Sequence, residues 1–106
     1  MMKIKDGLVG REAVIDRVRR VLSTQLLLSA YVYGSYANGT PSIDSDIDVL
    51  IVSQEPSSQL YKKLSLQFWN DPVPVEMVVY DEATFKSKLK DNQLVMSIVN
   101  KGIKII

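Results

Sequence analysis

The segment GSYANGTPSIDSDIDVLIV, residues 34–52, joins a small, polar, turn-prone half to a hydrophobic half typical of a buried strand. The strand begins with two aspartates separated by one residue, Asp46 and Asp48. Because strand side chains alternate, both carboxylates are expected on one face, with Cα atoms ~6.6 Å apart, while Ile47 and Val49 point into the core. Two carboxylates so close repel each other unless a cation lies between them, which indicates a site for hard divalent ions. The alternative is a solvated pair that only discourages edge pairing.

Composition restricts the chemistry that is available. The chain has 106 residues, 46% hydrophobic and 24% charged, which suits one domain, residues 1–106. A net charge of +1 gives no electrostatic case for nucleic acid as a direct substrate. Cysteine and histidine are absent, which excludes disulfides, thiolate metal sites and histidine-based catalysis. No apolar run approaches the ~18 residues of a membrane span and the N-terminus lacks a signal-peptide core, so a cytoplasmic protein is expected.

Hydrophobic periodicity predicts the order helix, strand, strand, helix, strand, helix, strand. The ranges are 11–24, 26–33, 46–53, a helix opening at Pro56 and broken at Asn70, 73–80, a helical region after an Asp81 N-cap through about Asn100, and 103–106. "KDN" near residue 91 is a candidate break in the last helical region, and Gly102 is its expected cap. The order predicts an α/β or α+β fold in two layers, with a small mixed sheet of about four strands flanked by helices.

Two further features support a site at the aspartate pair. Glu76 lies within the apolar strand VPVEMVVY, residues 73–80, where an unpaired carboxylate is costly. If this strand pairs beside the one that begins at Asp46, Glu76 reaches the same cluster; otherwise it faces water from an edge strand. Gly34 allows a sharp turn and close approach of a ligand, and Ser35 offers a hydroxyl and a backbone N–H of the kind that binds phosphate when a short helix follows.

Together these residues resemble the signature of the DNA polymerase β-like nucleotidyltransferase superfamily, most closely its minimal nucleotidyltransferase (MNT) members. Ala37 and Gly39 fit the pattern G-S-x-A-x-G, and "SDID" at residues 45–48 fits the acidic half. The tail NKGIKII is similar to the closing basic-Gly-apolar segment of the family. The resemblance implies a mixed sheet flanked by helices.

The resemblance also implies the roles of individual residues. Gly34 and Ser35 would hold the β- and γ-phosphates of ATP, and Asp46 and Asp48 would bind two Mg²⁺ ions. Glu76 would be the third carboxylate and metal ligand, and could take the acceptor proton. Many members have aspartate at this last position, so the glutamate is a departure from the family pattern.

For function, the resemblance implies transfer of AMP from ATP to a hydroxyl group. Single-domain members are similar to the antitoxin of a toxin–antitoxin pair whose partner is a helical HEPN protein, modified on a tyrosine. Two alternatives stay open: an aminoglycoside-type enzyme with its acceptor cleft at a dimer interface, and an inactive antitoxin that acts by binding alone. Homo- and hetero-oligomers are both compatible with the sequence. Tyr36 and Trp69 are the expected exposed contacts for a base or a partner.

Overall fold

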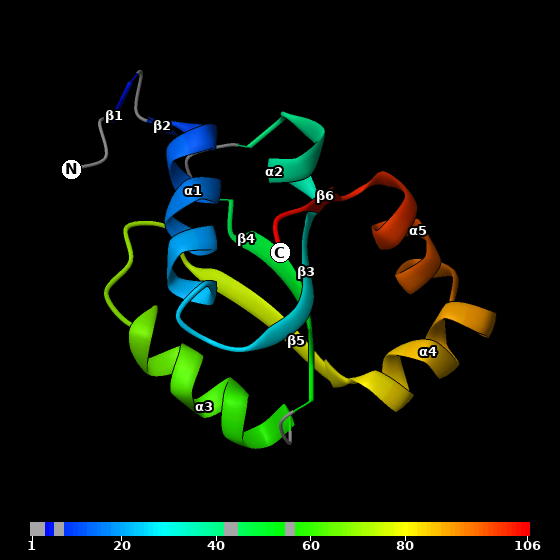
Figure 1. Ribbon diagram of the computed structural model, residues 1–106. Helices are drawn as coiled ribbons and strands as arrows, with labels where there is room; N and C mark the ends of the chain where they lie inside the picture. The colour runs from blue at the N-terminus through cyan, green and yellow to red at the C-terminus, as the bar shows by residue number, and fades with distance from the viewer. Residues whose placement is uncertain (1–3, 6–7, 42–44, 55–56) are drawn as a thin grey trace.

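The computed structural model describes residues 4–5, 8–41, 45–54 and 57–106 (Figure 1). The elements in chain order are β1 (Ile4–Lys5), β2 (Leu8–Val9), α1 (Arg11–Leu22), β3 (Leu27–Tyr33), α2 (Ser35–Asn38), β4 (Ile47–Ser53), α3 (Ser57–Gln67), β5 (Val75–Asp81), α4 (Glu82–Asp91), α5 (Gln93–Lys101) and β6 (Ile103–Lys104). None of the described helices is both long enough and apolar enough to cross a membrane.

The main sheet has the strand order β5-β4-β3-β6. β3 is antiparallel to both of its neighbours, β4 and β6, whereas β4 and β5 are parallel. Parallel neighbours need a crossover connection, and α3 supplies it. The predicted class, a small mixed sheet flanked by helices, is therefore confirmed.

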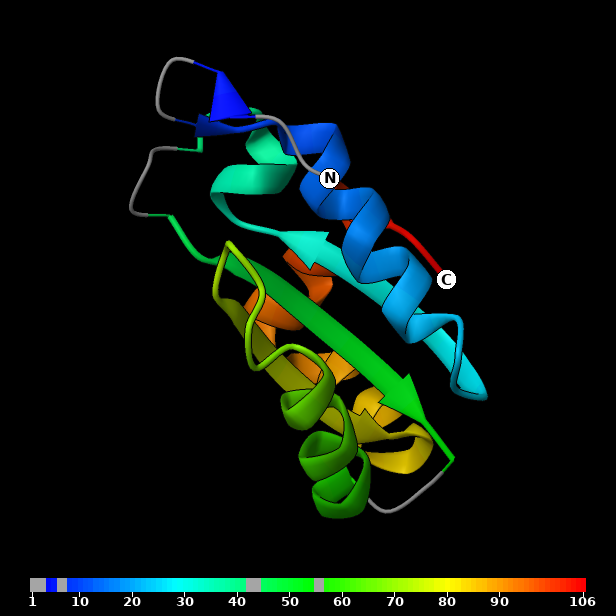
Figure 2. The ribbon, with the colours of Figure 1, turned by 90° about the vertical axis from the view of Figure 1, so that its left-hand side faces the viewer.

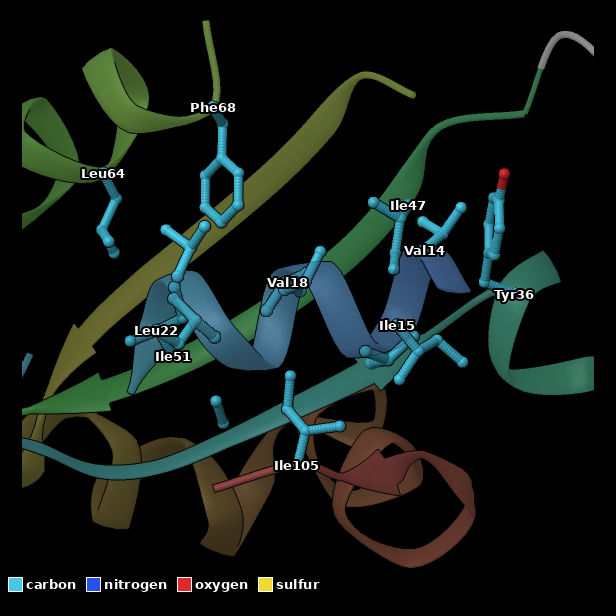
Figure 3. Close-up of a cluster of buried hydrophobic side chains, with 14 of the residues drawn as sticks. Val14, Ile15, Val18, Leu22, Tyr36, Ile47, Ile51, Leu64, Phe68 and Ile105 are labelled. Atoms are coloured by element: carbon cyan, nitrogen blue, oxygen red, sulfur yellow. The ribbon is translucent and has the colours of Figure 1, made fainter. Parts of the chain in front are cut away.

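Helices cover both faces of this sheet. α1 and α3 lie in front of it in Figure 2, and α4 and α5 lie behind it. The larger cluster of buried side chains fills the space beneath α1 and α3, and Figure 3 shows part of it. It includes Val18, Leu22, Val32, Ile51 and Leu64. A smaller cluster beneath α4 and α5 contains Tyr31, Leu50, Val95 and Ile98.

Local sequence explains where the helices begin and end. Asp81 accepts a hydrogen bond from the backbone N–H of Thr84 at 2.7 Å, which confirms it as the N-cap of α4. The break expected near residue 91 is at Asn92, whose side chain accepts from the N–H of Val95 at 3.0 Å and begins α5. Gly102 follows α5 as expected, and its N–H bonds to the carbonyl of Ile98. The two-residue strands β1 and β2, which pair with each other, were not predicted.

The expectation of two exposed aromatic contacts is half right. Trp69 is 81% exposed, as expected. Tyr36 is only 2% exposed, so the prediction for it was wrong. Its ring lies beside Val14 and Ile47 in the larger cluster (Figure 3). The ring therefore fills core volume between α2 and α1.

Candidate active site

The acidic residues meet because β4 and β5 pair in register. Asp48 and Glu76 are direct partners in this parallel pairing. On the other side of β4, Asp48 is the partner of Tyr33, the last residue of β3. Glu76 is exposed on an edge strand of the sheet and also adjoins the aspartate. Glu76 therefore both faces water from an edge strand and lies beside the aspartate, so the two interpretations of the sequence are compatible.

The carboxylates of Asp48 and Glu76 interact directly. Burial raises the pKa of Asp48 above its ordinary value, and a hydrogen bond with Glu76 raises it further. The negative charges of Glu76 and Asp46 add to the same shift. Within the described residues, no ion pair with lysine or arginine neutralises these three carboxylates. The site therefore has unbalanced negative charge and oxygen ligands, which is the chemistry that suits Mg²⁺.

Asp46 lies just before β4 and adds its carboxylate to the site from the start of that strand. Its charge raises the pKa of Tyr36, after the larger effect of burial. Among the described residues, no three side chains of His, Cys, Asp or Glu gather closely enough to enclose a metal ion. Mg²⁺ commonly takes only one or two protein carboxylates and completes its shell with water and substrate phosphates. The directly interacting carboxylates of Asp48 and Glu76 fit that mode of binding, with Asp46 close enough for its charge to act on Asp48.

Gly34 lies directly against the acidic pair. Its backbone has φ 72° and ψ −150°, a conformation that only glycine adopts readily. A Cβ atom at this position would lie 2.5 Å from Oδ2 of Asp48. The turn that leads into Ser35 and α2 therefore packs closer to the carboxylate than any side chain would allow. The predicted phosphate residues and the predicted metal ligands thus share one site.

Three residues that the sequence did not single out support or adjoin this site. Arg11 donates from Nε to the carbonyl of Tyr36 and from a terminal nitrogen to that of Ala37, which holds the end of α2. Tyr33, the last residue of β3, is the strand partner of Asp48: burial raises the pKa of its hydroxyl, with further contributions from nearby Asp48, Glu76 and Tyr80. Lys101 lines a pocket beside Gly34. Tyr33 directly precedes Gly34 in the chain and Lys101 belongs to the tail NKGIKII, whereas Arg11 reaches α2 only through helix packing.

Comparisons with known proteins agree with this fold. A toxin–antitoxin pair, MntA–HpeT, in a mutant form with two Asp→Glu substitutions separated by one residue, is 19% identical, with a TM-score of 0.54 over 87% of this chain and 72% of that one. A toxin–antitoxin structure with AMP-PNP is 21% identical, with a TM-score of 0.55 and the same coverage of 87% and 72%. At these identities the similarity shows a shared fold. No curated protein sequence matches this chain.

The sequence model of one family matches residues 15–105, which extends from α1 to β6 and includes every predicted site residue. That range is most of the chain and contains the glycine turn, the aspartate pair and the glutamate in one continuous match. On this evidence the chain belongs to the nucleotidyltransferase domain family.

Proposed function

We propose that this protein transfers AMP from ATP to the hydroxyl group of a tyrosine on a HEPN-family helical partner, as the antitoxin of a toxin–antitoxin pair. The observation that carries the proposal is the contact between a glycine turn and an in-register carboxylate pair, Gly34 against Asp48 and Asp48 beside Glu76. Membership of the nucleotidyltransferase domain family supports the reaction type.

In this proposal the residues of the site have separate roles. Asp46, Asp48 and Glu76 would hold Mg²⁺, which would lower the pKa of the acceptor hydroxyl and offset charge on the phosphates. Gly34 and Ser35 orient the β- and γ-phosphates through the turn before α2, so that the leaving group is in line with the attacking oxygen. Glu76 is exposed at the sheet edge, where an acceptor hydroxyl can reach it from solvent.

The reaction balances with these groups. The acceptor oxygen forms a bond to the α-phosphorus of ATP, and the bond from that phosphorus to the oxygen bridging to the β-phosphate breaks. Pyrophosphate leaves with the electron pair of the broken bond. The hydroxyl proton passes to the carboxylate of Glu76 and from there to water.

The partner and the nucleotide are suggested by the structural neighbours. Both are toxin–antitoxin structures, and one contains AMP-PNP, an analogue of ATP. The other carries substitutions in two aspartates with the same spacing as Asp46 and Asp48. These similarities motivate the assignment of AMP, a toxin partner and the acidic pair in this protein.

The proposal is tested with α-labelled ATP, Mg²⁺ and the protein encoded by the neighbouring gene. Label is expected on a tyrosine of that protein, and Asp46→Asn, Asp48→Asn and Glu76→Gln are each expected to abolish it. Asp91→Asn, an exposed charge change at the end of α4, is the matched control and should transfer normally. Each variant is checked by circular dichroism to show that it is folded.

The rival functions give different results in the same experiment. Label on an added aminoglycoside, without a complex between the two proteins, would indicate a small-molecule transferase. A stable complex without label would indicate an antitoxin that acts by binding alone. Transfer that survives both aspartate changes would disprove the metal-site assignment.

A further inference from the structure

A pocket opens next to the glycine turn, between α2 and α5. Its volume is about 360 Å³, within the usual range for small-molecule sites. Tyr33 and Gly34 form one wall, Asn38 lies on α2, and Ser97 and Lys101 come from α5. Figure 1 shows α2 and the end of α5 at the same end of the sheet. The pocket thus adjoins the turn that packs against the carboxylates.

Strand pairing holds the end of α5 at this level. β3 pairs antiparallel with β6, with Val32 opposite Ile103. Lys101 ends α5 two residues before β6, and it lines the same pocket as Gly34. A Cβ atom on Gly102 would lie 2.8 Å from the carbonyl oxygen of Val32, so only glycine allows the chain to leave α5 this close to β3. The position of Lys101 is therefore set by backbone packing.

The resulting row of groups has opposite charges at its two ends. Glu76, Asp48 and the turn at Gly34 follow the strand order β5-β4-β3, and Lys101, at the end of α5 and next to β6, lines the pocket beside Gly34. Among the residues that the structure describes, Lys101 is the only one with a charged side chain that lines the pocket. It is exposed and takes part in no ion pair within the described residues. A lysine in the last turn of a helix also interacts favourably with the helix dipole, so the test must separate that structural role from ligand binding.

We infer that this pocket receives the phosphate end of the nucleotide and that the ammonium group of Lys101 contacts the phosphates from the side opposite the carboxylates. This inference rests on the proposed function, because it assumes a nucleoside triphosphate in the site. A triphosphate that extends past Gly34 away from the carboxylates meets the ammonium group of Lys101. Within the described residues, no carboxylate forms an ion pair with Lys101 and competes for it.

The experiment measures binding of MgATP and of adenosine by isothermal titration calorimetry, using the full chain without its partner. Lys101→Ala is expected to weaken MgATP binding about tenfold, the scale of one charged hydrogen bond to a solvated phosphate, and to leave adenosine binding unchanged. Lys101→Arg should restore most of the affinity. Lys90→Ala removes an exposed lysine near the end of α4, outside the pocket, and should leave the affinity for both ligands unchanged.

Ionic strength supplies a second readout that helix stability does not affect. The salt dependence of MgATP affinity should be smaller for Lys101→Ala than for the native protein, and unchanged for Lys90→Ala. If the native protein binds MgATP and Lys101→Ala binds it equally well, the inference is wrong while the proposed function stands. Equal weakening for ATP and adenosine would overturn the phosphate contact. If the native protein binds no nucleotide, both proposals are overturned.

Discussion

Replacing Gly34 with alanine should destabilise the protein more than the same change at Gly39. Both residues have positive φ, at 72° and 76°. Gly39 has ψ 20°, in the left-handed region, and a Cβ there meets nothing within 4 Å, so only the backbone cost of roughly 1–2 kcal/mol is expected. Gly34 has ψ −150°, a region that costs roughly 1–3 kcal/mol for other residues. Its Cβ would also lie 2.5 Å from Oδ2 of Asp48 and force that side chain off its rotamer, at roughly 0.5–1.5 kcal/mol more.

The expected loss for Gly34→Ala is therefore about 1.5–4.5 kcal/mol, the sum of the backbone and rotamer costs. Urea unfolding followed by circular dichroism measures it. A double-mutant cycle isolates the contact, because Asp48→Ala removes the oxygen that the new Cβ would meet. In the Asp48→Ala background, Gly34→Ala should cost about 1 kcal/mol less than in the native background, which is the rotamer term. If Gly34→Ala costs no more than Gly39→Ala, or if the cycle shows no coupling, the close approach of turn and carboxylate is refuted.

Three further predictions concern titration, the core and a helix cap. Because the pKa of Asp48 is raised in the folded state, the folded protein binds more protons, so stability falls as pH rises from the ordinary value of 3.8 through the folded value. Without Mg²⁺, Asp48→Asn should therefore be more stable than the native protein at pH 7 and lose this advantage below about pH 4. Urea unfolding across that pH range measures the effect. A stability difference between the two proteins that does not change with pH would contradict the pKa shift. On α3, Leu64→Ala should cost roughly 2–5 kcal/mol of stability because the Leu64 side chain is fully buried. The Leu66 side chain is 78% exposed, so Leu66→Ala should change stability by less than about 0.5 kcal/mol. Similar thermal midpoints for the two variants would contradict the packing. Asn92→Ala should cost about 1 kcal/mol through loss of the bond from the N–H of Val95, with Asn92→Asp retaining most of it in the same unfolding assay.

The sheet and the acidic site were largely predictable because their signals are local. Alternation along residues 46–53 placed the carboxylates on one face, ahead of Leu50 and Val52, and Ile47, Val49 and Ile51 on the other. The cap at Asp81 and the break at Asn92 each depend on a side chain that bonds to a backbone N–H three residues later. Such short-range signals can be read directly from the sequence. The register of Asp48 with Glu76 was a condition that the sequence could not establish, since it depends on which strand becomes the neighbour of β4.

The remaining features depend on packing between distant segments. Tyr36 looks like an exposed loop residue in the sequence, and its burial results from the space that α1 leaves above α2. Arg11 reaches the end of α2 only because α1 starts beside it. Lys101 reads as an ordinary surface lysine until the pairing of β3 with β6 brings it beside Gly34. The pairing of β1 with β2 involves strands of two residues each, too short for periodicity to reveal.

The parallel pairing of β4 with β5 has a consequence for how the protein acquires its chemistry. The antiparallel pair β3–β4 brings Gly34 and Asp48 together without any later part of the chain. Glu76 joins them only through the crossover, because parallel neighbours cannot be connected by a tight turn. A fragment that ends before β5 would therefore contain the turn and the aspartates but not the glutamate. The completed carboxylate pair depends on the crossover through α3 as well as on the pairing of β3 with β4.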